Sequence, residues 1–361
     1  MIPSYNKVHL KFKLNGVNYN QDDIKEVAYS FIKEGLPYEQ AVGDFLIDWL
    51  DSKSFIKVKS TGTTGKPKLI KLDKQAMVNS SIFTGNFFNL APGDKALHCL
   101  PANFIAGKMM LVRAMILGLE IDLIEPSAHP VFNSKRAYDF CAMLPIQLQN
   151  SIDKIGNFKN IIVGSVKASN ELIDAIKDFP VNIFESFGMT ETATHIALKA
   201  LNNFNKEGND FSQDKSVFKT LPDIFVSQDE RGCLVIKSPH LSKHPIVTND
   251  IVKLYSDTEF EWLGRFDNVI NSGGVKIFPE SVEEKLYGKI DCKFFIASEK
   301  DKKLGERVII IVEKEFADID TSIFNILDKY ERPKHIYAVK KFDVISEKIQ
   351  RNKILKKIGV I

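Results

Sequence analysis

This 361-residue sequence has few cysteines and no apolar segment at its N-terminus. Without such a segment, nothing in the sequence indicates a secretory signal peptide. The cysteines lie far apart and match neither a disulfide framework nor the ligand spacing of a zinc site. They are Cys99, Cys141, Cys233 and Cys292. We therefore expect a protein of the reducing cytoplasm.

The sequence also lacks a membrane span and a dense block of basic residues. Its most apolar window, residues 105–124, is interrupted by charged residues, whereas a bilayer span needs about 20 mostly uncharged residues. The interruptions are Lys108, Arg113, Glu120 and Asp122. Basic residues are spread along the chain, and the net charge is only +3. We expect no membrane span and no nucleic acid partner, whereas small anions remain candidate ligands.

The pattern of apolar residues predicts an α/β fold. Residues 1–50 predict a hairpin at Asn15-Gly16 and two helices that end near Trp49. From residue 54 onward, short apolar strands alternate with helical stretches. Such alternation is typical of a largely parallel sheet whose strand ends carry the active loops.

The pattern changes after about residue 215. Short strands separated by turn residues predict a β-rich subdomain, and the last stretch then alternates strand, helix, strand and helix. We expect a large N-terminal α/β domain, residues 1–266, which contains the parallel sheet and the β-rich subdomain. A small α+β domain, residues 267–361, would follow it.

The stretch STGTTGKPK, residues 60–68, has the composition of a phosphate-binding loop. Its two glycines allow a tight turn that exposes backbone amides, and its hydroxyls and lysines add donors and positive charge. It is not a Walker loop, because only two residues separate the glycines. Taken alone, a flexible surface turn explains the composition equally well. The candidate phosphate ligands are Ser60, Thr61, Gly62, Thr63, Thr64, Gly65 and Lys68.

Three further stretches follow this loop: ESFGMTETA at 185–193, TND at 248–250 together with GRFDNVINSGGVKIFP at 264–279, and SEKIQR at 346–351. In this order the four stretches resemble the adenylate-forming acyl-CoA synthetase superfamily. The resemblance implies an ATP-dependent acid-thiol ligase that uses Mg²⁺ and coenzyme A. A substrate carboxylate would displace pyrophosphate from the α-phosphate of ATP, and the thiol of coenzyme A would then attack the acyl-adenylate.

The resemblance also implies roles for the first two stretches. Residues 60–68 would hold the β- and γ-phosphates, and Phe187, beside Gly188, would lie against adenine. Thr190 would contact the α-phosphate and Glu191 would hold the magnesium ion, for which carboxylate oxygen is a suitable ligand. The alternative is that Thr190 or Glu191 only caps a helix. The superfamily usually has tyrosine at the position of Phe187.

Asp250 and Arg265 would hold the ribose hydroxyls, with a surface ion pair as the alternative. Asn249 occupies a position that is usually glycine in the superfamily. Asp267 falls at the hinge about which the small C-terminal domain of the resembling enzymes rotates between the two half-reactions. That rotation would bring the stretch that contains Lys276 to face the substrate.

Lys348 would bridge the carboxylate and phosphate oxygens in the first half-reaction. It precedes an apolar helix at the spacing KIxR, whereas a lysine near a C-terminus is usually just solvated. Glu347 stands where the superfamily usually has glycine. The catalytic candidates are therefore Lys348, Thr190 and Glu191.

The acid-binding pocket of the superfamily involves the helix after CLP and the turn at Gly164. Arg113 on that helix matches the branch that activates o-succinylbenzoate in menaquinone biosynthesis, and its planar fork suits a second substrate carboxylate. Lys108 is about 140° away around the helix, so we expect only one of the two in the pocket. Another aryl or fatty acid, an internal acidic partner for Arg113, and a nucleotide-binding protein without ligase activity remain alternatives. A homodimer is possible.

Overall fold

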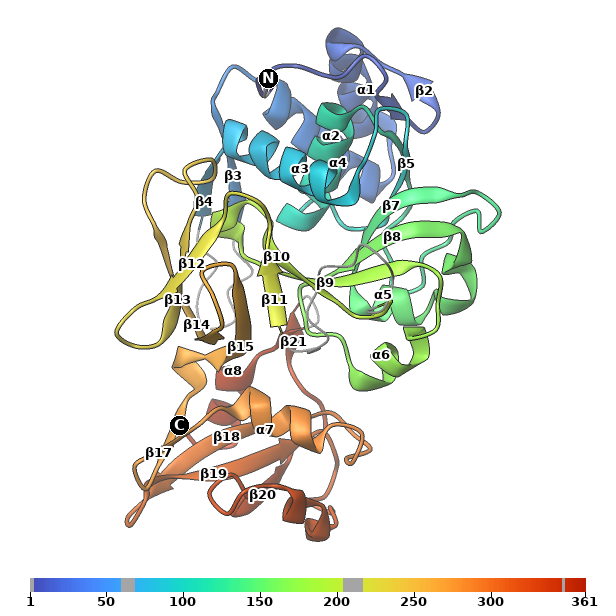
Figure 1. The fold of residues 1–361 in the computed structure, drawn as a ribbon. Helices are drawn as coiled ribbons and strands as arrows, with labels where there is room; N and C mark the ends of the chain where they lie inside the picture. The colour runs from blue at the N-terminus through green and yellow to red at the C-terminus, as the bar shows by residue number, and fades with distance from the viewer. Residues whose placement is uncertain (1–2, 60–68, 204–216, 346–347) are drawn as a thin grey trace. The chain divides into compact units, whose positions relative to one another are not determined.

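The computed structural model describes residues 3–59, 69–203, 217–345 and 348–361 (Figure 1). Contacts divide the chain into two compact units. The first comprises the described residues within Met1–Ser60, Lys68–Phe225 and Lys237–Ile246. The second comprises Val226–Ile236 and the described residues within Val247–Ile361.

The first unit opens with the predicted hairpin and two helices. These elements are β1 (Lys13–Leu14), β2 (Val17–Asn18), α1 (Gln21–Glu34) and α2 (Pro37–Leu50). Asn15 and Gly16 both have positive φ, as a tight two-residue turn requires. α1 begins with a capping box, in which the Asn20 side chain accepts from the N–H of Asp23 and the Asp23 carboxylate accepts from the N–H of Asn20.

The rest of the first unit alternates strands and helices around a mostly parallel sheet. Its strands are β3 (Phe55–Lys59), β4 (Leu69–Asp73), β5 (Lys95–His98), β6 (Glu120–Leu123), β7 (Tyr138–Met143), β8 (Phe158–Val163), β9 (Asn182–Gly188), β10 (His195–Ala200) and β11 (Val217–Thr220). Its helices are α3 (Lys74–Phe88), α4 (Ile105–Leu117), α5 (Pro145–Gln149), η1 (Ile152–Asn157), α6 (Asn170–Ile176) and η2 (Thr190–Thr192).

The large sheet of this unit has the order β11-β10-β9-β8-β7-β5-β6-β1-β2, whereas β3 and β4 form a two-stranded sheet of their own. From β1 to β9 neighbouring strands are parallel except in the β1–β2 hairpin, whereas β10 is antiparallel to both β9 and β11. The central strands are apolar on both faces; for example, Ile161 and Ile162 point to opposite faces of β8 and are both buried. The predicted α/β fold with a largely parallel sheet is therefore confirmed.

The second unit contains the strand-rich stretch and the C-terminal segment. Its strands are β12 (Phe225–Gln228), β13 (Cys233–Lys237), β14 (Ile246–Leu254), β15 (Glu259–Arg265), β16 (Ile270–Ser272), β17 (Val275–Ile277), β18 (Phe294–Asp301), β19 (Gly305–Val312), β20 (His335–Ala338), β21 (Val344–Ile345) and β22 (Lys348–Ile349). Its helices are η3 (Phe266–Asn268), α7 (Pro279–Leu286), η4 (Thr321–Ile326) and α8 (Arg351–Lys357).

Strand β19 separates two small cores in this unit. Successive residues of a strand point to opposite faces of a sheet. Ile310 accordingly packs with residues of α7 and η4, whereas Ile309 and Ile311 pack with Ile354 and Leu355 of α8. The predicted boundary between residues 266 and 267 lies within this unit, and the division of the chain into two domains at that position stays a prediction.

Among the described residues, no helix has the length and apolar character that a membrane crossing requires.

Candidate active site

The turn after Phe187 holds the chain tightly between β9 and β10. A Cβ at Gly188 would press against the carbonyl oxygen of Thr194 and the Cα of His195, at separations that real side chains do not adopt. Only glycine therefore allows the two strands to approach this closely. The Phe187 ring is half-buried, and its centroid lies 5.7 Å from that of Phe218.

Thr192 closes the short helix η2 that follows this turn. Its hydroxyl accepts from the N–H of Met189 at 3.0 Å and lies 2.6 Å from the carbonyl oxygen of Thr194. Thr190 is the first residue of η2, and Thr192 supplies the hydroxyl that accepts from the N-cap backbone at Met189, so the alternative that Thr190 starts a helix stays open beside its predicted role. Thr190 is half-buried and Glu191 is exposed.

The exposed carboxylate of Glu191 suits the predicted magnesium ion. Mg²⁺ is usually held by one or two protein carboxylates together with substrate phosphates and water. Within the described ranges, no group of three or more histidine, cysteine, aspartate or glutamate side chains is placed to hold a metal ion. A single carboxylate at this position therefore fits an ion that arrives with ATP better than a metal caged by the protein alone.

In the second unit, Asp250 and Arg265 face each other on paired strands. The two residues are direct partners in the β14–β15 ladder, and Arg265 Nη1 lies 3.4 and 3.3 Å from the two carboxylate oxygens of Asp250. Trp262 Nε1 donates to Asp250 Oδ1 at 3.0 Å. The sequence did not single out Trp262. Among the described side chains, Arg265 alone contacts the other carboxylate oxygen, Asp250 Oδ2.

Asn249 links the neighbouring loop to the predicted hinge residue. Its amide nitrogen Nδ2 lies 3.3 Å from Asp267 Oδ2, and its Oδ1 accepts from Arg231 Nη1 at 3.0 Å. The Arg231 guanidinium also lies 5.1 Å from the centroid of the Phe266 ring. The side chain that replaces the usual glycine is thus held by a polar network, which the sequence did not predict.

Arg113 is buried in the first unit without an ion pair to any described carboxylate. Its exposure is 1%, and burial lowers the pKa of its guanidinium to about 9. Nε donates to Thr84 Oγ1 at 3.3 Å, and Nη2 donates to Thr194 Oγ1 at 3.1 Å. The ring centroid of Phe140 lies 5.9 Å from Cζ. Neutral oxygens therefore solvate the charge without balancing it.

His195 is a further member of this network, and the sequence singled out neither it nor Thr84 and Thr194. Its Nδ1 lies 3.4 Å from Arg113 Nη2, and its Nε2 lies 3.5 Å from Thr84 Oγ1. Burial, and secondly the charge of Arg113, holds the pKa of His195 well below its ordinary value. The imidazole is therefore neutral, accepts from Arg113 through Nδ1 and carries its proton on Nε2. Through Thr194 and His195, Arg113 is tied to the turn that carries Thr190.

Lys108 and Gly164 have different surroundings. Lys108 is half-buried on the other side of α4, where its Nζ lies 4.8 Å from the ring centroid of Phe45 on α2. Burial lowers the pKa of Lys108. Gly164 follows β8, and a Cβ there would collide with Ser186 Oγ. Ser186 lies in the ESFGMTETA stretch, whereas Arg113 contacts Thr194 and His195, the two residues that directly follow it.

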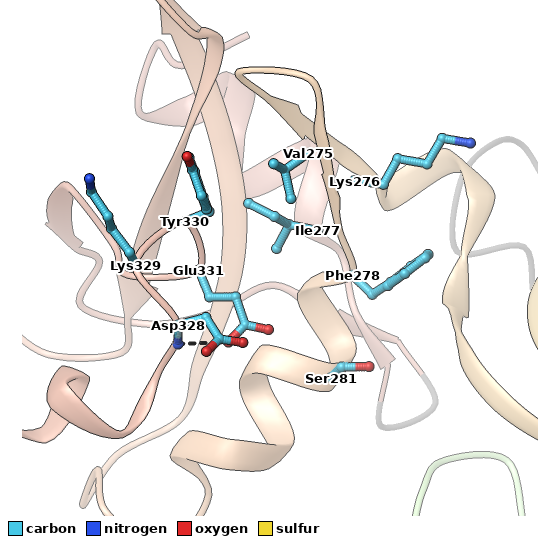
Figure 2. Close-up of a pocket in the computed structure, with 9 residues that line it drawn as sticks. All are labelled: Val275, Lys276, Ile277, Phe278, Ser281, Asp328, Lys329, Tyr330 and Glu331. Atoms are coloured by element: carbon cyan, nitrogen blue, oxygen red, sulfur yellow. Dashed lines mark hydrogen bonds between the residues drawn. The ribbon is translucent and has the colours of Figure 1, made fainter.

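Lys276 lines a cavity of about 470 Å³ in the second unit (Figure 2). The cavity lies between the end of β17 and the loop at residues 328–331. Figure 2 shows Lys276 and Phe278 pointing away from Tyr330 and Lys329, which lie on the opposite side. Of the predicted site residues that the structure describes, only Lys276 lines this cavity.

Two predicted elements fall wholly or partly outside the described residues. All the candidate phosphate ligands lie in residues 60–68, between the paired strands β3 and β4. Residues 346–347, which include Glu347, are also outside the described ranges. The backbone of Lys348 is described: it belongs to β22, and Lys348 pairs with Ile345 of β21.

Comparison with known proteins gives consistent matches. The family described as AMP-binding enzyme matches residues 60–243. The 2-succinylbenzoate–CoA ligase of Listeria monocytogenes is 24% identical, in an alignment that covers 96% of this chain and 81% of the relative. The ligase of the same name from Geobacillus is also 24% identical, with 78% and 64% covered.

Solved structures extend the comparison. An acyl-CoA synthetase (AMP-forming)/AMP-acid ligase II-like protein from Dyadobacter fermentans is 33% identical, with a TM-score of 0.59, and the match covers 93% of this chain and 98% of that one. The o-succinylbenzoate coenzyme A synthetase of Bacillus subtilis, in complex with ATP and magnesium ion, is 20% identical, with a TM-score of 0.69 and coverages of 82% and 69%. At the latter identity, the likeness shows the fold alone.

Proposed function

The chain belongs to the AMP-binding enzyme family, and from this premise we propose that it is a ligase that joins 2-succinylbenzoate to coenzyme A. The general reaction class, an AMP-forming acid–CoA ligase that uses ATP, Mg²⁺ and coenzyme A, rests on the family match and on the relatives together. The identity of the acid rests on the names of the relatives and on Arg113. A cytoplasmic location and a homodimer stay predictions.

The reaction joins two anions, so positive charge and positioning must supply most of the catalysis. In the first step, a carboxylate oxygen forms a bond to the α-phosphorus of ATP and pyrophosphate leaves. In the second step, the thiol sulfur attacks the acyl carbon, the thiol proton is lost, and AMP leaves with that carboxylate oxygen. We propose that Lys348 and Thr190 stabilise the charge that develops in the first step.

The remaining predicted residues would bind the substrates. We propose that residues 60–68 hold the β- and γ-phosphates and that Phe187 and Gly188 bound the adenine site. Asp250 would accept from the ribose hydroxyls, with Arg265 beside it. Magnesium, when bound at Glu191, would neutralise phosphate charge. Gly164 and Lys276 would face the acid, and a C-terminal domain that begins at residue 267 would move between the two steps.

Arg113 is the observation that carries the choice of acid. A fully buried guanidinium without a described carboxylate partner costs free energy unless an anion reaches it. 2-Succinylbenzoate has two carboxylates, so one can react at the phosphate while the other pairs with Arg113. A monoacid could not balance that charge.

We predict that Arg113 sets a preference for diacids. In wild type, kcat/KM for 2-succinylbenzoate should exceed that for benzoate and medium-chain fatty acids. Arg113→Gln should lower kcat/KM for the diacid about 100-fold, the scale of a lost charge-assisted contact, and change the values for monoacids by less than about threefold. Pyrophosphate release with ATP, magnesium and coenzyme A measures all of these.

Lys108→Gln provides the control, because it removes a cation from the same helix. It should leave the diacid preference unchanged. A wild-type enzyme that prefers a monoacid, or an Arg113→Gln variant that keeps the diacid preference, would refute the assignment of 2-succinylbenzoate. A lack of pyrophosphate release with every acid would instead favour a nucleotide-binding protein without ligase activity.

A further inference from the structure

Arg351 lies next to the hairpin that carries Lys348. It is the first residue of α8, three positions after the lysine. The hairpin itself is short: Val344 pairs with Ile349, and Ile345 pairs with Lys348. Two pairs of residues cannot hold an orientation alone, because an isolated hairpin is marginally stable even when it is longer. The position of Lys348 therefore depends on what anchors the ends of the hairpin.

The guanidinium of Arg351 contacts two other elements of the same unit. Nη2 donates to Glu283 Oε2 on α7 at 2.7 Å, and Nη1 donates to the carbonyl oxygen of Ile296 on β18 at 3.3 Å. Nη1 also lies 3.9 Å from Glu280 Oε1, and Cζ lies 5.5 Å from the ring centroid of Phe295. One side chain thus ties the start of α8 to both α7 and β18.

Glu283 is itself held in place. Its Oε1 accepts from the N–H of Ile296 at 2.7 Å, so both carboxylate oxygens have donors. The side chains of Arg351 and Glu283 are 22% and 20% exposed. Burial lowers the pKa of Arg351, but the Glu283 and Glu280 carboxylates outweigh it and keep the guanidinium charged. A planar fork with carboxylate and carbonyl partners fixes direction as well as distance.

A second ion pair at the hairpin is of a different kind. Lys353 Nζ contacts Asp343 Oδ1 at 2.7 Å, but the two side chains are 69% and 31% exposed. Exposed pairs of this type contribute little and are screened by salt. Of the two ion pairs, Arg351–Glu283 is therefore the stronger anchor, and it acts beside the apolar packing of Phe342 and Ile349.

We infer that Arg351 is a positioning residue for adenylate formation, which holds the Lys348 hairpin through Glu283 and Ile296. The inference rests on the proposed function, and within it on the role of Lys348 in the first half-reaction. Arg351 touches no substrate in this account and acts only through the lysine. Its loss should therefore matter in the half-reaction that uses Lys348 and not in the other.

The test measures the two half-reactions separately in the full chain. Arg351→Gln should slow adenylate formation about 10- to 100-fold, because a displacement of about 1 Å can cost that much. Thioester formation from preformed acyl-adenylate should change by less than about twofold. Arg351→Lys, which keeps the charge but loses the fork, should recover part of the first rate. Lys356→Gln, an exposed substitution on the same helix, should match wild type.

The Lys348→Ala background separates positioning from a general structural role. If Arg351 acts through Lys348, then adding Arg351→Gln to Lys348→Ala should lower adenylate formation by less than about threefold further. Additive losses, or equal losses in both half-reactions, would overturn the inference. Glu283→Gln tests the same anchor from the other side and should reproduce the Arg351→Gln pattern if Arg351→Gln unfolds. A failure of the proposed function would appear separately, as a wild type that forms no adenylate or a Lys348→Ala variant that forms it normally.

Discussion

Two buried basic side chains in the first unit differ in whether a carboxylate of the same unit balances their charge. Lys74 is fully buried, and its Nζ contacts Asp51 Oδ1 at 2.8 Å, so its charge is paired within the unit. Arg113 is equally buried but has hydroxyls, an imidazole and an aromatic face around it. Because stability alone rarely maintains an unbalanced buried charge, the Arg113 site favours a role in binding an anion.

His98 carries a prediction about pH. Its ring is 2% exposed, Nε2 contacts the carbonyl oxygen of Gly107 at 3.1 Å, and burial lowers its pKa to about 4. The unfolded chain binds this proton near pH 6.5 and the folded chain only near pH 4. The stabilisation from the neutral ring is therefore complete above pH 6.5 and is lost as the pH falls toward 4, by up to about 3 kcal/mol.

Urea unfolding at several pH values checks this prediction. The difference in unfolding free energy between wild type and His98→Asn should shrink steadily between pH 7 and pH 4. Comparison with the variant removes the contribution of other groups that titrate over the same range. A difference that stays constant over this range would contradict the account.

At the scale of elements, the β9–η2–β10 turn depends on Gly188. Gly188→Ala should force the start of β10 away and move Thr190 and Glu191 with η2, because the new Cβ would meet backbone atoms, which cannot rotate aside. We expect adenylate formation to fall about 100-fold. Gly156→Ala is the matched control, since nothing lies within 4 Å of a Cβ at that position. Pyrophosphate exchange measures both variants, and equal rates would argue against the role of this turn.

The sequence predicted the elements whose cause is local. The Asn15-Gly16 hairpin, the two helices that follow it and the strand–helix alternation all depend on neighbouring residues, and the structure confirms them. The partners of Arg113 are different, because Thr84 and His195 lie 29 and 82 positions away in the chain. No local pattern marks His195 as a member of that network. The same holds for Trp262 beside Asp250, which depends on the register of β14 and β15.

For the whole molecule, the candidate residues are distributed over both compact units. The first unit holds Arg113, Gly164 and the Phe187–Glu191 turn, and the second holds Asp250, Arg265, Lys276 and Lys348. The proposed reaction can be tested without knowing how these residues meet: a carboxylate oxygen would attack the α-phosphorus, and that oxygen would leave with AMP.

The most direct measurement of this claim follows that oxygen. The enzyme is incubated with ATP, magnesium, coenzyme A and 2-succinylbenzoate labelled with ¹⁸O in its carboxylates, and the products are analysed by mass spectrometry. We predict one ¹⁸O atom in each AMP formed, unlabelled pyrophosphate, and one thioester for each AMP. AMP without the label, or ADP with labelled phosphate, would contradict it.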